Sequence, residues 1–589
     1  MNDRFDARRS TQAAGLLRAF NDAGVLAPAD VHVARRLAAM AGERDEAVAL
    51  AAALAVRGPR LGHVYVDLDT VRETITVEDD EPVNLADLPW PDDWLARLER
   101  SGLVAVGEDG DGGRPLRLVG SSLYLDRYWR EERQIAADLL ALAGEPPVDG
   151  AVLAGGLDRL LRDDSRQRLA AETAVRRRFA VVAGGPGTGK TTTVAKIVAL
   201  LFEQGDPLVA LAAPTGKAAA RLIEAVREEA AGFDVSEDVR ARLLALDAST
   251  LHRLLGWRPG THSRFRHHRD NRLPHDVVIV DETSMVSLSL MARLVESVRP
   301  EARLILVGDP GQLTSIEAGA VLGDIVGPEG EGIVVLDRVH RFGGAIAEVA
   351  EAIRRGDGDA VIGALGEVEW IPVDPGDPDA LGALAPVRRG ATASAREVLD
   401  AARAGEGQRA IDALGAFRVL CAHRRGAHGV SAWTARIEGW LAEAVEGFGA
   451  AGEWYPGRPL LVTENDYGLR LYNGDTGVVI ASGPGRVSAA FERQGQVLEF
   501  SPARLAAVET VYAMTVHKSQ GSQFDTAAVL LPDPSSHILT RELLYTAVTR
   551  ARRHLILAGT EEAIRAAVAR PVARASGLRG RLWPARSAG

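Results

Sequence analysis

The sequence contains one cysteine, Cys421, few aromatic residues and no long apolar run. A single cysteine excludes an intramolecular disulfide framework and a zinc site built from several cysteines. No window approaches the ~18 consecutive apolar residues that a membrane-spanning helix requires. The first fifteen residues carry charges of both signs and lack the apolar segment of a secretory signal. Together these absences predict a cytoplasmic protein.

Lysine is also scarce, because only four of the 69 basic residues are lysine and the other 65 are arginine. A compact ammonium and a wide, planar guanidinium are not interchangeable in a tight phosphate site. The positions where lysine remains are therefore candidate sites at which an ammonium is required, such as a phosphate site. The formal net charge of −11 argues against coating nucleic acid by bulk attraction, although a local groove can still be basic. The four lysines are Lys190, Lys196, Lys217 and Lys518.

The chain is long enough for three or four globular domains, with 589 residues, 46% hydrophobic and 25% charged. Short apolar strands alternate with helical stretches, which is typical of an α/β parallel sheet covered by helices. The acidic run at 78–81 predicts a solvated loop, and the Pro-, Gly- and Asp-rich stretch at 374–394 predicts a loop or linker. The expected strands are 179–182, 208–212, 276–280, 304–307, 417–421, 526–531 and 554–558.

A phosphate-binding loop is the strongest motif, since residues 184–191 fit the pattern G-x-x-x-x-G-K-[ST] between a strand and a helix. Glycines let backbone N–H groups converge on phosphates, and the following helix offers its positive end. Lys190 is expected to neutralise the β- and γ-phosphate oxygens, and Thr191 to ligate magnesium. The expected nucleotide contacts are Gly184, Gly185, Pro186, Gly187, Thr188, Gly189, Lys190, Thr191 and Thr192.

Two further strand ends supply the groups that an ATPase needs. The strand at 277–280 ends in Asp281 and Glu282, which are expected to hold the metal and to deprotonate the attacking water, respectively. The strand at 303–307 runs into a turn that carries Gln312, whose amide is expected near the γ-phosphate. The sequence therefore predicts an ATP site with Mg²⁺ at one edge of a parallel sheet.

The order of these motifs resembles the superfamily 1 helicases, and several further strings resemble the RecD-like branch. These strings are 211–222, 248–256 and 514–525. The resemblance implies that their polar residues touch single-stranded DNA, and small hydroxylated residues at a strand-to-helix turn suit a phosphate contact. Gln523 stands where the family normally has glutamate. The residues that the resemblance places at DNA are Pro214, Thr215, Lys217, Ser249, Thr250, His252, Thr515, His517, Lys518 and Ser519.

The resemblance also implies two arginines that reach the γ-phosphate across a cleft between domains, namely Arg341 and Arg550. Such cations stabilise the charge of phosphoryl transfer and tie it to domain closure. Gln167 resembles the glutamine that recognises adenine in the family. From about 165 to 560 the chain resembles RecD, the family of alpha subunits of exodeoxyribonuclease V, and 121–132 resembles the segment that joins the family's amino-terminal domain to its motor.

The family implies an α/β fold with two RecA-like P-loop domains, an inserted SH3-like β-barrel and an α-rich amino-terminal domain. We expect a partner-docking domain over 1–120, a linker over 121–164 and RecA-like domain 1A over 165–340. Domain 2A is expected over 341–455 and 509–589, which includes a basic tail, with the barrel 2B inserted at 456–508.

The implied function is a 5′ to 3′ single-strand DNA motor, driven by ATP and Mg²⁺, that acts on double-strand DNA ends with RecB-like and RecC-like subunits. No separate nuclease motif is visible in the sequence. Two alternatives remain open. One is a self-sufficient RecD-like or conjugative helicase, although this chain lacks room for the longer amino-terminal extension of the stand-alone relatives. The other is a subunit whose ATPase acts as a regulatory switch.

Overall fold

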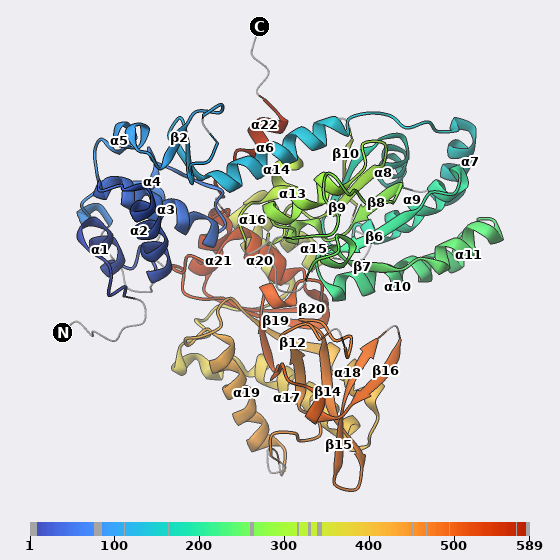
Figure 1. Cartoon of the computed structure of the whole chain (residues 1–589). Coiled ribbons are helices and arrows are strands. Elements are labelled where there is room, and N and C mark those ends of the chain that lie inside the picture. The colour runs from blue at the N-terminus through green and yellow to red at the C-terminus, as the bar shows by residue number, and fades with distance from the viewer. Residues whose placement is uncertain are drawn as a thin grey trace.

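Four β-sheets organise the chain in this computed structural model (Figure 1). The acidic run at 78–81 and Arg341 lie outside the described residues. We refer to an amino-terminal unit, a first and a second parallel-sheet unit, and an inserted sheet. The structure describes residues 9–75, 85–110, 112–162, 164–258, 264–314, 317–327, 332–338, 344–446, 448, 452–466, 468–493, 495–572 and 574–584.

The first parallel-sheet unit contains six strands in the order β10-β5-β9-β8-β6-β7, and all of their pairings are parallel. The four strands that the sequence predicts here are confirmed within two residues. Strand β9 lies between β5 and β8, so the segments that follow these three strands meet at one edge. The strands are β5 (Phe179–Gly184), β6 (Val209–Ala213), β7 (Ala248–Thr250), β8 (Val277–Val280), β9 (Arg303–Gly308) and β10 (Ile333–Leu336).

Alternating apolar residues cover both faces of this sheet. On β8, Val278 and Val280 face one core and Val277 and Ile279 face the other, and all four are fully buried. Because successive side chains of a strand point to opposite faces, a strand covered on both sides is apolar throughout. One core includes helices α6 (Asp126–Ala141), α13 (Leu288–Ser297) and α14 (Val321–Ile325). The other includes α7 (Gly150–Leu160), α8 (Ser165–Arg176), α9 (Lys190–Gln204), α10 (Gly216–Gly232) and α11 (Glu237–Ala245).

The second parallel-sheet unit has five strands in the order β11-β20-β19-β12-β18, again with parallel pairings. Helices α15 (Ala345–Arg355), α16 (Gly358–Ala364), α20 (Arg541–Val548) and α21 (Glu561–Ala569) cover one face. The expected strands at 417–421, 526–531 and 554–558 are confirmed. The strands are β11 (Glu369–Ile371), β12 (Phe417–Cys421), β18 (Ala513–Thr515), β19 (Phe524–Leu530) and β20 (Ala551–Ala558).

The prediction of a loop at 374–394 is wrong for the second half of the segment, which forms the start of helix α17 (Ala385–Arg403). Pro386 lies in the first turn, where its missing N–H costs no helical hydrogen bond. Gly390 allows a close approach, since a Cβ there would lie 2.3 Å from the Phe417 ring. Pro386 and Gly390 are therefore both compatible with a helix. Helix α17 packs with α19 (Val430–Ala444) and with α18 (Gly407–Ala416).

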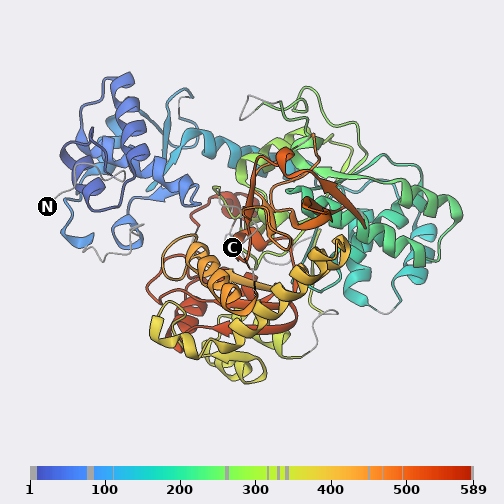
Figure 2. The same ribbon diagram turned by 90° about the horizontal axis from the view of Figure 1, so that it is seen from below.

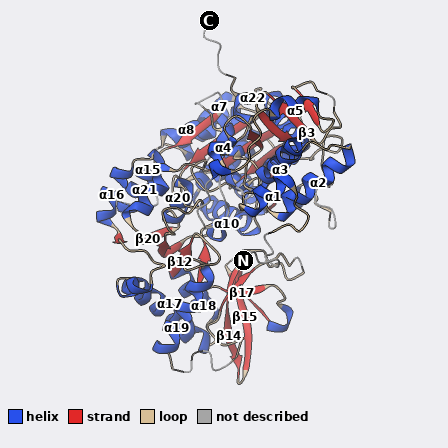
Figure 3. Ribbon diagram, turned by 90° about the vertical axis from the view of Figure 1, so that its left-hand side faces the viewer, coloured by secondary structure: helices blue, strands red, loops and turns tan. Residues whose placement is uncertain are grey.

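The inserted sheet is antiparallel, with five strands in the order β16-β15-β14-β13-β17 (Figure 3). Leu460, Val479 and Phe491 form part of its own small core. The predicted run of short strands across 456–508 is confirmed as a sheet. Its strands are β13 (Pro459–Val462), β14 (Thr476–Gly483), β15 (Arg486–Arg493), β16 (Gln496–Phe500) and β17 (Val508–Thr510).

The amino-terminal unit lies to one side of the other units in two perpendicular views (Figures 1 and 2). Its helices pack on a four-stranded sheet of order β1-β4-β3-β2, so the unit contains a sheet as well as the expected helices. Strand β4 falls in the segment expected as a linker. The elements are α1 (Gly15–Asp22), α2 (Pro28–Ala41), α3 (Glu46–Arg60), α4 (Val71–Thr74), α5 (Trp94–Arg100), β1 (Tyr65–Asp67), β2 (Val104–Val106), β3 (Leu116–Val119) and β4 (Ser122–Leu125).

Candidate functional site: a cavity between the two parallel-sheet units

The glycine-rich loop after β5 forms a compact turn that ends at the start of α9. Gly187 and Gly189 have φ values of 78° and 80°, a region that side chains other than glycine rarely adopt. The Lys190 ammonium donates to the carbonyl oxygens of Gly184 (2.7 Å) and Gly185 (2.9 Å). Among the described residues, these two backbone oxygens are the hydrogen-bond acceptors of the Lys190 ammonium, and they hold it inside the loop. Gln167, at the start of α8, is buried and donates to the Thr188 carbonyl at 3.4 Å, beside the same loop.

Asp281 and Glu282 follow β8 at the same sheet edge. Asp281 is buried, and burial together with the neighbouring Glu282 carboxylate raises its pKa to about 7. Its Oδ1 accepts a 2.8 Å hydrogen bond from the Glu282 backbone N–H. Glu282 has a φ of 50°, and the only other described non-glycine residue with positive φ is Arg470. Such a conformation costs on the order of 1–3 kcal/mol and turns the Glu282 side chain into the cavity.

The turn after β9 joins the two parallel-sheet units. The buried Gln312 donates from Nε2 to Asp309 Oδ2 at 3.1 Å. The Tyr545 hydroxyl, on α20 of the second unit, donates to the same oxygen at 3.2 Å. A Cβ on Gly185 would lie 2.9 Å from that hydroxyl, so Tyr545 also abuts the phosphate-binding loop. Burial raises the pKa of Asp309.

Leu313, the next residue of this turn, is inserted into the second unit. Its side chain is buried in the second unit's core. Its N–H donates to Thr546 Oγ1 at 2.9 Å, and its carbonyl accepts from Gln520 Nε2 at 2.7 Å. A change in the position of the second unit therefore acts directly on the turn that carries Gln312.

Arg550 lies between α20 and β20 and is 3% exposed. Its guanidinium donates to the carbonyls of Thr546 (3.0 Å) and Ser522 (3.1 Å) and to Thr549 Oγ1 (3.3 Å), all within the second unit. Burial lowers its pKa, while Glu282 and Asp309 raise it. Arg550 therefore faces the carboxylates of the first unit across the interface. The other predicted arginine, Arg341, lies outside the described residues.

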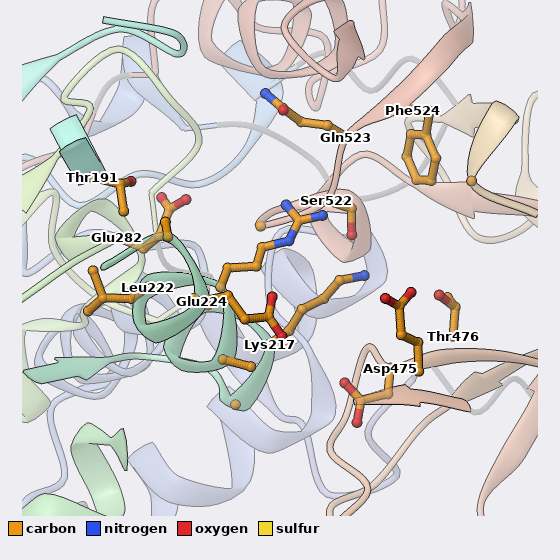
Figure 4. A pocket seen from close by; sticks show the side chains of 18 of the residues that line it. Thr191, Lys217, Leu222, Glu224, Glu282, Asp475, Thr476, Ser522, Gln523 and Phe524 are labelled. Atoms are coloured by element: carbon orange, nitrogen blue, oxygen red, sulfur yellow. The ribbon is translucent and has the colours of Figure 1, made fainter. Parts of the chain in front are cut away.

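One cavity of about 1020 Å³ brings most of these groups together. Figure 4 shows Thr191 and Glu282 on one side, Asp475 and Thr476 on the other, and Lys217 between them. Helix α10 and the inserted sheet close part of the wall. A Cβ at Gly216 would lie 2.5 Å from the Tyr472 ring, which shows how tightly they pack. The predicted site residues that line the cavity are Pro186, Gly187, Gly189, Lys190, Thr191, Thr192, Lys217, Asp281, Glu282, Gln312 and Arg550.

The structure separates Lys217 from the other residues predicted to contact DNA, because Lys217 lies in this cavity. Burial and the nearby Arg221 lower the pKa of Lys217 to about 7, opposed by Asp475. Thr192, a predicted nucleotide contact that lines the cavity, donates from its hydroxyl to Glu229 at 2.8 Å.

The remaining residues predicted to contact DNA lie at or just after the carboxyl ends of β6, β7 and β18. Of these, β7 and β18 are edge strands of the two parallel sheets. Thr250 pairs in register with Ala213, so its turn lies beside Pro214 and Thr215. Thr215, Thr250 and Thr515 each accept a 3.2 Å bond from a backbone N–H three residues later. A hydroxyl used in this way can still donate its proton to a phosphate oxygen.

Other residues predicted to contact DNA lie near these turns. His252 is exposed and packs near Phe265. The Ser249 hydroxyl donates to the Thr250 carbonyl at 3.4 Å. Lys518 lies 3.6 Å from Glu509. Burial lowers the pKa of the half-buried His517, and the nearby Arg574 lowers it further.

Ser519 is the exception in this group. It is fully buried, and its hydroxyl donates to the Val516 carbonyl at 2.7 Å. The hydroxyl thus stabilises the turn after β18 and does not reach the surface, so the expected DNA contact is wrong for the structure described here.

The described part of the chain contains no cluster of three or more His, Cys, Asp or Glu side chains arranged to hold a metal. Among the helices that the structure describes, none is both long and apolar enough to cross a membrane. Cys421 is free and buried.

Three family models match the chain. The model described as the AAA domain matches residues 163–374, and the UvrD-like helicase C-terminal domain matches residues 510–558. The model described as RecBCD enzyme subunit RecD, N-terminal domain, matches residues 22–124. The matches thus cover the amino-terminal unit and parts of both parallel-sheet units.

Two mycobacterial relatives are similar to almost the whole chain. RecBCD enzyme subunit RecD of Mycolicibacterium smegmatis is 51% identical over 97% of this chain and 99% of the relative. The protein of the same name from Mycobacterium tuberculosis is 52% identical, over 98% of each chain. The ATP-dependent RecD2 DNA helicase of Deinococcus radiodurans is 32% identical, over 81% of this chain but 61% of the relative.

Proposed function

The chain belongs to the RecD family, and from this premise we propose that it is the 5′ to 3′ single-strand DNA motor of a RecBCD-type helicase-nuclease. Its activity is that of an ATP-dependent DNA helicase. The observation that carries the proposal is one cavity that gathers Lys190, Glu282, Gln312 and Arg550 from both parallel-sheet units. ATP hydrolysis in such a cavity is coupled to the relative position of the units.

Each group has a chemical task in this proposal. Lys190 exchanges its backbone carbonyl partners for the β- and γ-phosphate oxygens of ATP. Glu282 accepts a proton from the water that attacks the γ-phosphorus, so that ADP and inorganic phosphate leave. Arg550 and Gln312 stabilise the negative charge that develops on the γ-phosphate. Gln167 faces the base side, next to the loop that it already contacts.

Magnesium fits the oxygen donors that are present. Mg²⁺ prefers oxygen ligands and commonly keeps several waters and substrate phosphates, so one carboxylate and one hydroxyl are sufficient protein ligands. Asp281 and Thr191 would hold it, and both line the cavity. The ion would neutralise phosphate charge.

Single-stranded DNA is proposed to cross the carboxyl ends of β6, β7 and β18. The support is the hydroxyl-rich turns at Thr215, Thr250 and Thr515, which lie on both units. The domain limits given above remain part of the proposal, including the inserted sheet as an SH3-like barrel. Five antiparallel strands with a separate apolar core support that assignment.

RecB-like and RecC-like subunits are the proposed partners, since the relatives are subunits of that enzyme by name. We propose that the amino-terminal unit docks onto them, because it has its own core and none of its described residues lines the ATP cavity. Deleting residues 1–125, which removes its whole sheet, should abolish co-purification with both subunits while ATPase activity remains. Full assembly of the truncated chain would contradict the docking role.

A self-sufficient helicase is the second candidate. RecD2 is similar over only 61% of its own length, whereas the RecBCD subunits match almost completely. The higher identity to the two mycobacterial RecD subunits, 51% and 52% against 32% for RecD2, favours the subunit. A regulatory ATPase would use the same cavity but would not separate strands, so a strand-separation assay on the assembled complex distinguishes the two.

The test of the ATPase assignment is Glu282→Gln, which keeps the shape but loses the proton acceptor. It should bind nucleotide normally and reduce DNA-stimulated hydrolysis by at least about 100-fold, the range for loss of a positioned base. Glu562→Gln, at an exposed position on α21, is the matched control. Wild-type turnover in Glu282→Gln would overturn the assignment.

A further inference from the structure

One face of helix α10 lines the cavity. Lys217, Arg221, Glu224 and Glu228 recur every three or four residues and all contribute to the cavity wall. The opposite face is buried in the core of the first unit through Ile223, Val226 and Ala230. The two cations therefore have a direction fixed by the packing of the helix, toward the interface with the second unit.

Arg221 contributes a guanidinium to the wall of this cavity. Within the described residues it forms no hydrogen bond and no ion pair, whereas Arg550 donates to three oxygens. Burial and repulsion by Arg552 and Arg550 lower the pKa of Arg221 to about 10, and Glu282 opposes this. A guanidinium enclosed among like charges is stabilised when an anion enters. The wall around Arg221 thus forms an anion site.

The composition of the wall indicates which anion enters. Arg221 shares the cavity with Lys190, Thr191 and Glu282, the groups that surround a triphosphate in the proposed function. The hydroxyls proposed to hold a DNA strand, on Thr215, Thr250 and Thr515, are not among the residues that line it. A nucleotide phosphate therefore fits the position better than a DNA phosphate.

We propose that Arg221 binds the γ-phosphate of ATP from the first parallel-sheet unit, opposite Arg550 of the second unit. The inference rests on the proposed ATPase function and adds a residue that no helicase motif in the sequence analysis assigns to nucleotide. Arg221 and Arg550 then hold the same phosphate from two sides, and both contacts end when phosphate leaves.

The position of Arg221 on α10 gives this contact a second consequence. Helix α10 starts directly after Thr215, whose hydroxyl caps it by accepting from Ala218 N–H. The turn at Pro214 and Thr215 is proposed to contact single-stranded DNA. A rigid helix thus connects the γ-phosphate to bound DNA, and any coupling of the two binding events is reciprocal.

The experiment compares Arg221→Ala and Arg221→Lys with wild type in binding of ADP and of a non-hydrolysable ATP analogue, both with Mg²⁺. We expect Arg221→Ala to weaken binding of the analogue about tenfold or more and to leave ADP affinity unchanged, because ADP lacks the contacted phosphate. DNA-stimulated kcat should fall by about 100-fold or more, within the range for loss of one group that stabilises transition-state charge. The ATP analogue should also lose its effect on single-stranded DNA affinity.

Arg553→Ala is the matched control, since Arg553 follows Arg552 on β20, is exposed and does not line the cavity. It should match wild type in every assay. An unchanged ratio of ATP-analogue to ADP affinity in Arg221→Ala, with kcat within threefold of wild type, would overturn the inference. If Arg221→Ala is poorly folded, Arg221→Lys decides, because it keeps the charge but loses the planar donor pair. Absence of ATPase activity in wild type would instead refute the proposed function.

Discussion

At the scale of single residues, the scarcity of lysine agrees with the geometry at Lys190. Its ammonium lies between two carbonyl oxygens of the loop, 2.7 and 2.9 Å away, inside a turn only eight residues long. A guanidinium is wider and planar, and it cannot occupy that position without moving the loop backbone.

Lys190→Arg should therefore nearly abolish ATP hydrolysis although the charge is retained. We expect at least about a 100-fold loss of kcat, in the range found when one group that stabilises transition-state charge is lost. The measurement is ATPase activity with and without single-stranded DNA. Lys196→Arg, six residues further along α9, is the control and should retain most activity. Equal activity of the two variants would show that the lysine pattern has no mechanistic meaning.

Sequence analysis identified the residues of the phosphate-binding loop, Asp281, Glu282 and Gln312, because short motifs fix both residue type and spacing. It did not identify Arg221 or Tyr545. Arg221 is one of 65 arginines, so its residue type carries no information, and only the packing of α10 directs it into the cavity. The bond from Tyr545 to Asp309 spans 236 residues, and no local pattern encodes such a contact.

At the scale of elements, the turn after β9 is held between α20 and the turn after β18. Thr546 and Gln520 supply its two contacts from the second unit. Gln520 follows the proposed strand contact Lys518 by two residues, and Leu313 follows Gln312 directly. Lys518, Gln520, Leu313 and Gln312 thus connect the proposed DNA contact to the proposed ATP site.

Gln520→Ala should weaken this connection. The Leu313 carbonyl loses its partner, which costs roughly 1–3 kcal/mol for a buried group and loosens the turn that carries Gln312. We expect basal ATPase activity close to wild type and a loss of most of the stimulation by single-stranded DNA. The measurement is the ratio of kcat with and without DNA. Gln408→Ala, at an exposed position on α18, is the control, and equal stimulation in both variants would contradict the coupling role.

The strands are more predictable from the sequence than the long helix α17 of the second unit. Buried parallel strands are apolar throughout, so the segments at 179–182 and 417–421 are visible without any tertiary information. Helix α17 was missed because proline and glycine near its start resemble loop chemistry. Helix α17 accommodates Pro386 because it lies in the first turn, and Gly390 because the Phe417 ring packs against it. Neither circumstance can be read from the local sequence.

At the scale of the whole molecule, the carboxyl-terminal segment returns from the second unit to the amino-terminal unit. Val64 N–H donates to the Ala575 carbonyl at 2.8 Å, and Arg574 donates to the Glu317 and Gly319 carbonyls at 3.1 Å each. Helix α22 (Leu578–Leu582) then packs on α6 and α14. This segment connects three units, and a buried carboxyl, Glu132 of α6, lies at its centre.

Glu132 is fully buried, and its Oε1 accepts from Ser576 Oγ (2.7 Å) and Gly577 N–H (2.9 Å). Burial raises its pKa from 4.5 to about 7 despite these donors and Arg581. A raised folded-state pKa means that the folded chain binds the proton more tightly than the unfolded chain. The resulting stabilisation is complete below about pH 4.5 and is lost as the pH rises through about 7.

Glu132→Gln should remove this pH dependence, because a neutral amide keeps the acceptor oxygen and never ionises. Wild type and variant should unfold at similar temperatures near pH 4.5, and the variant should be more stable above pH 7. The expected difference there is roughly 3 kcal/mol, from about 1.4 kcal/mol per pKa unit. The measurement is the thermal midpoint of both proteins from pH 4.5 to 8. Glu99→Gln, at an exposed position on α5, controls for the loss of one charge. Parallel curves for wild type and Glu132→Gln at every pH would show that the Glu132 carboxyl does not set the stability of this junction, and that the carboxyl-terminal segment is held by its backbone and arginine contacts instead.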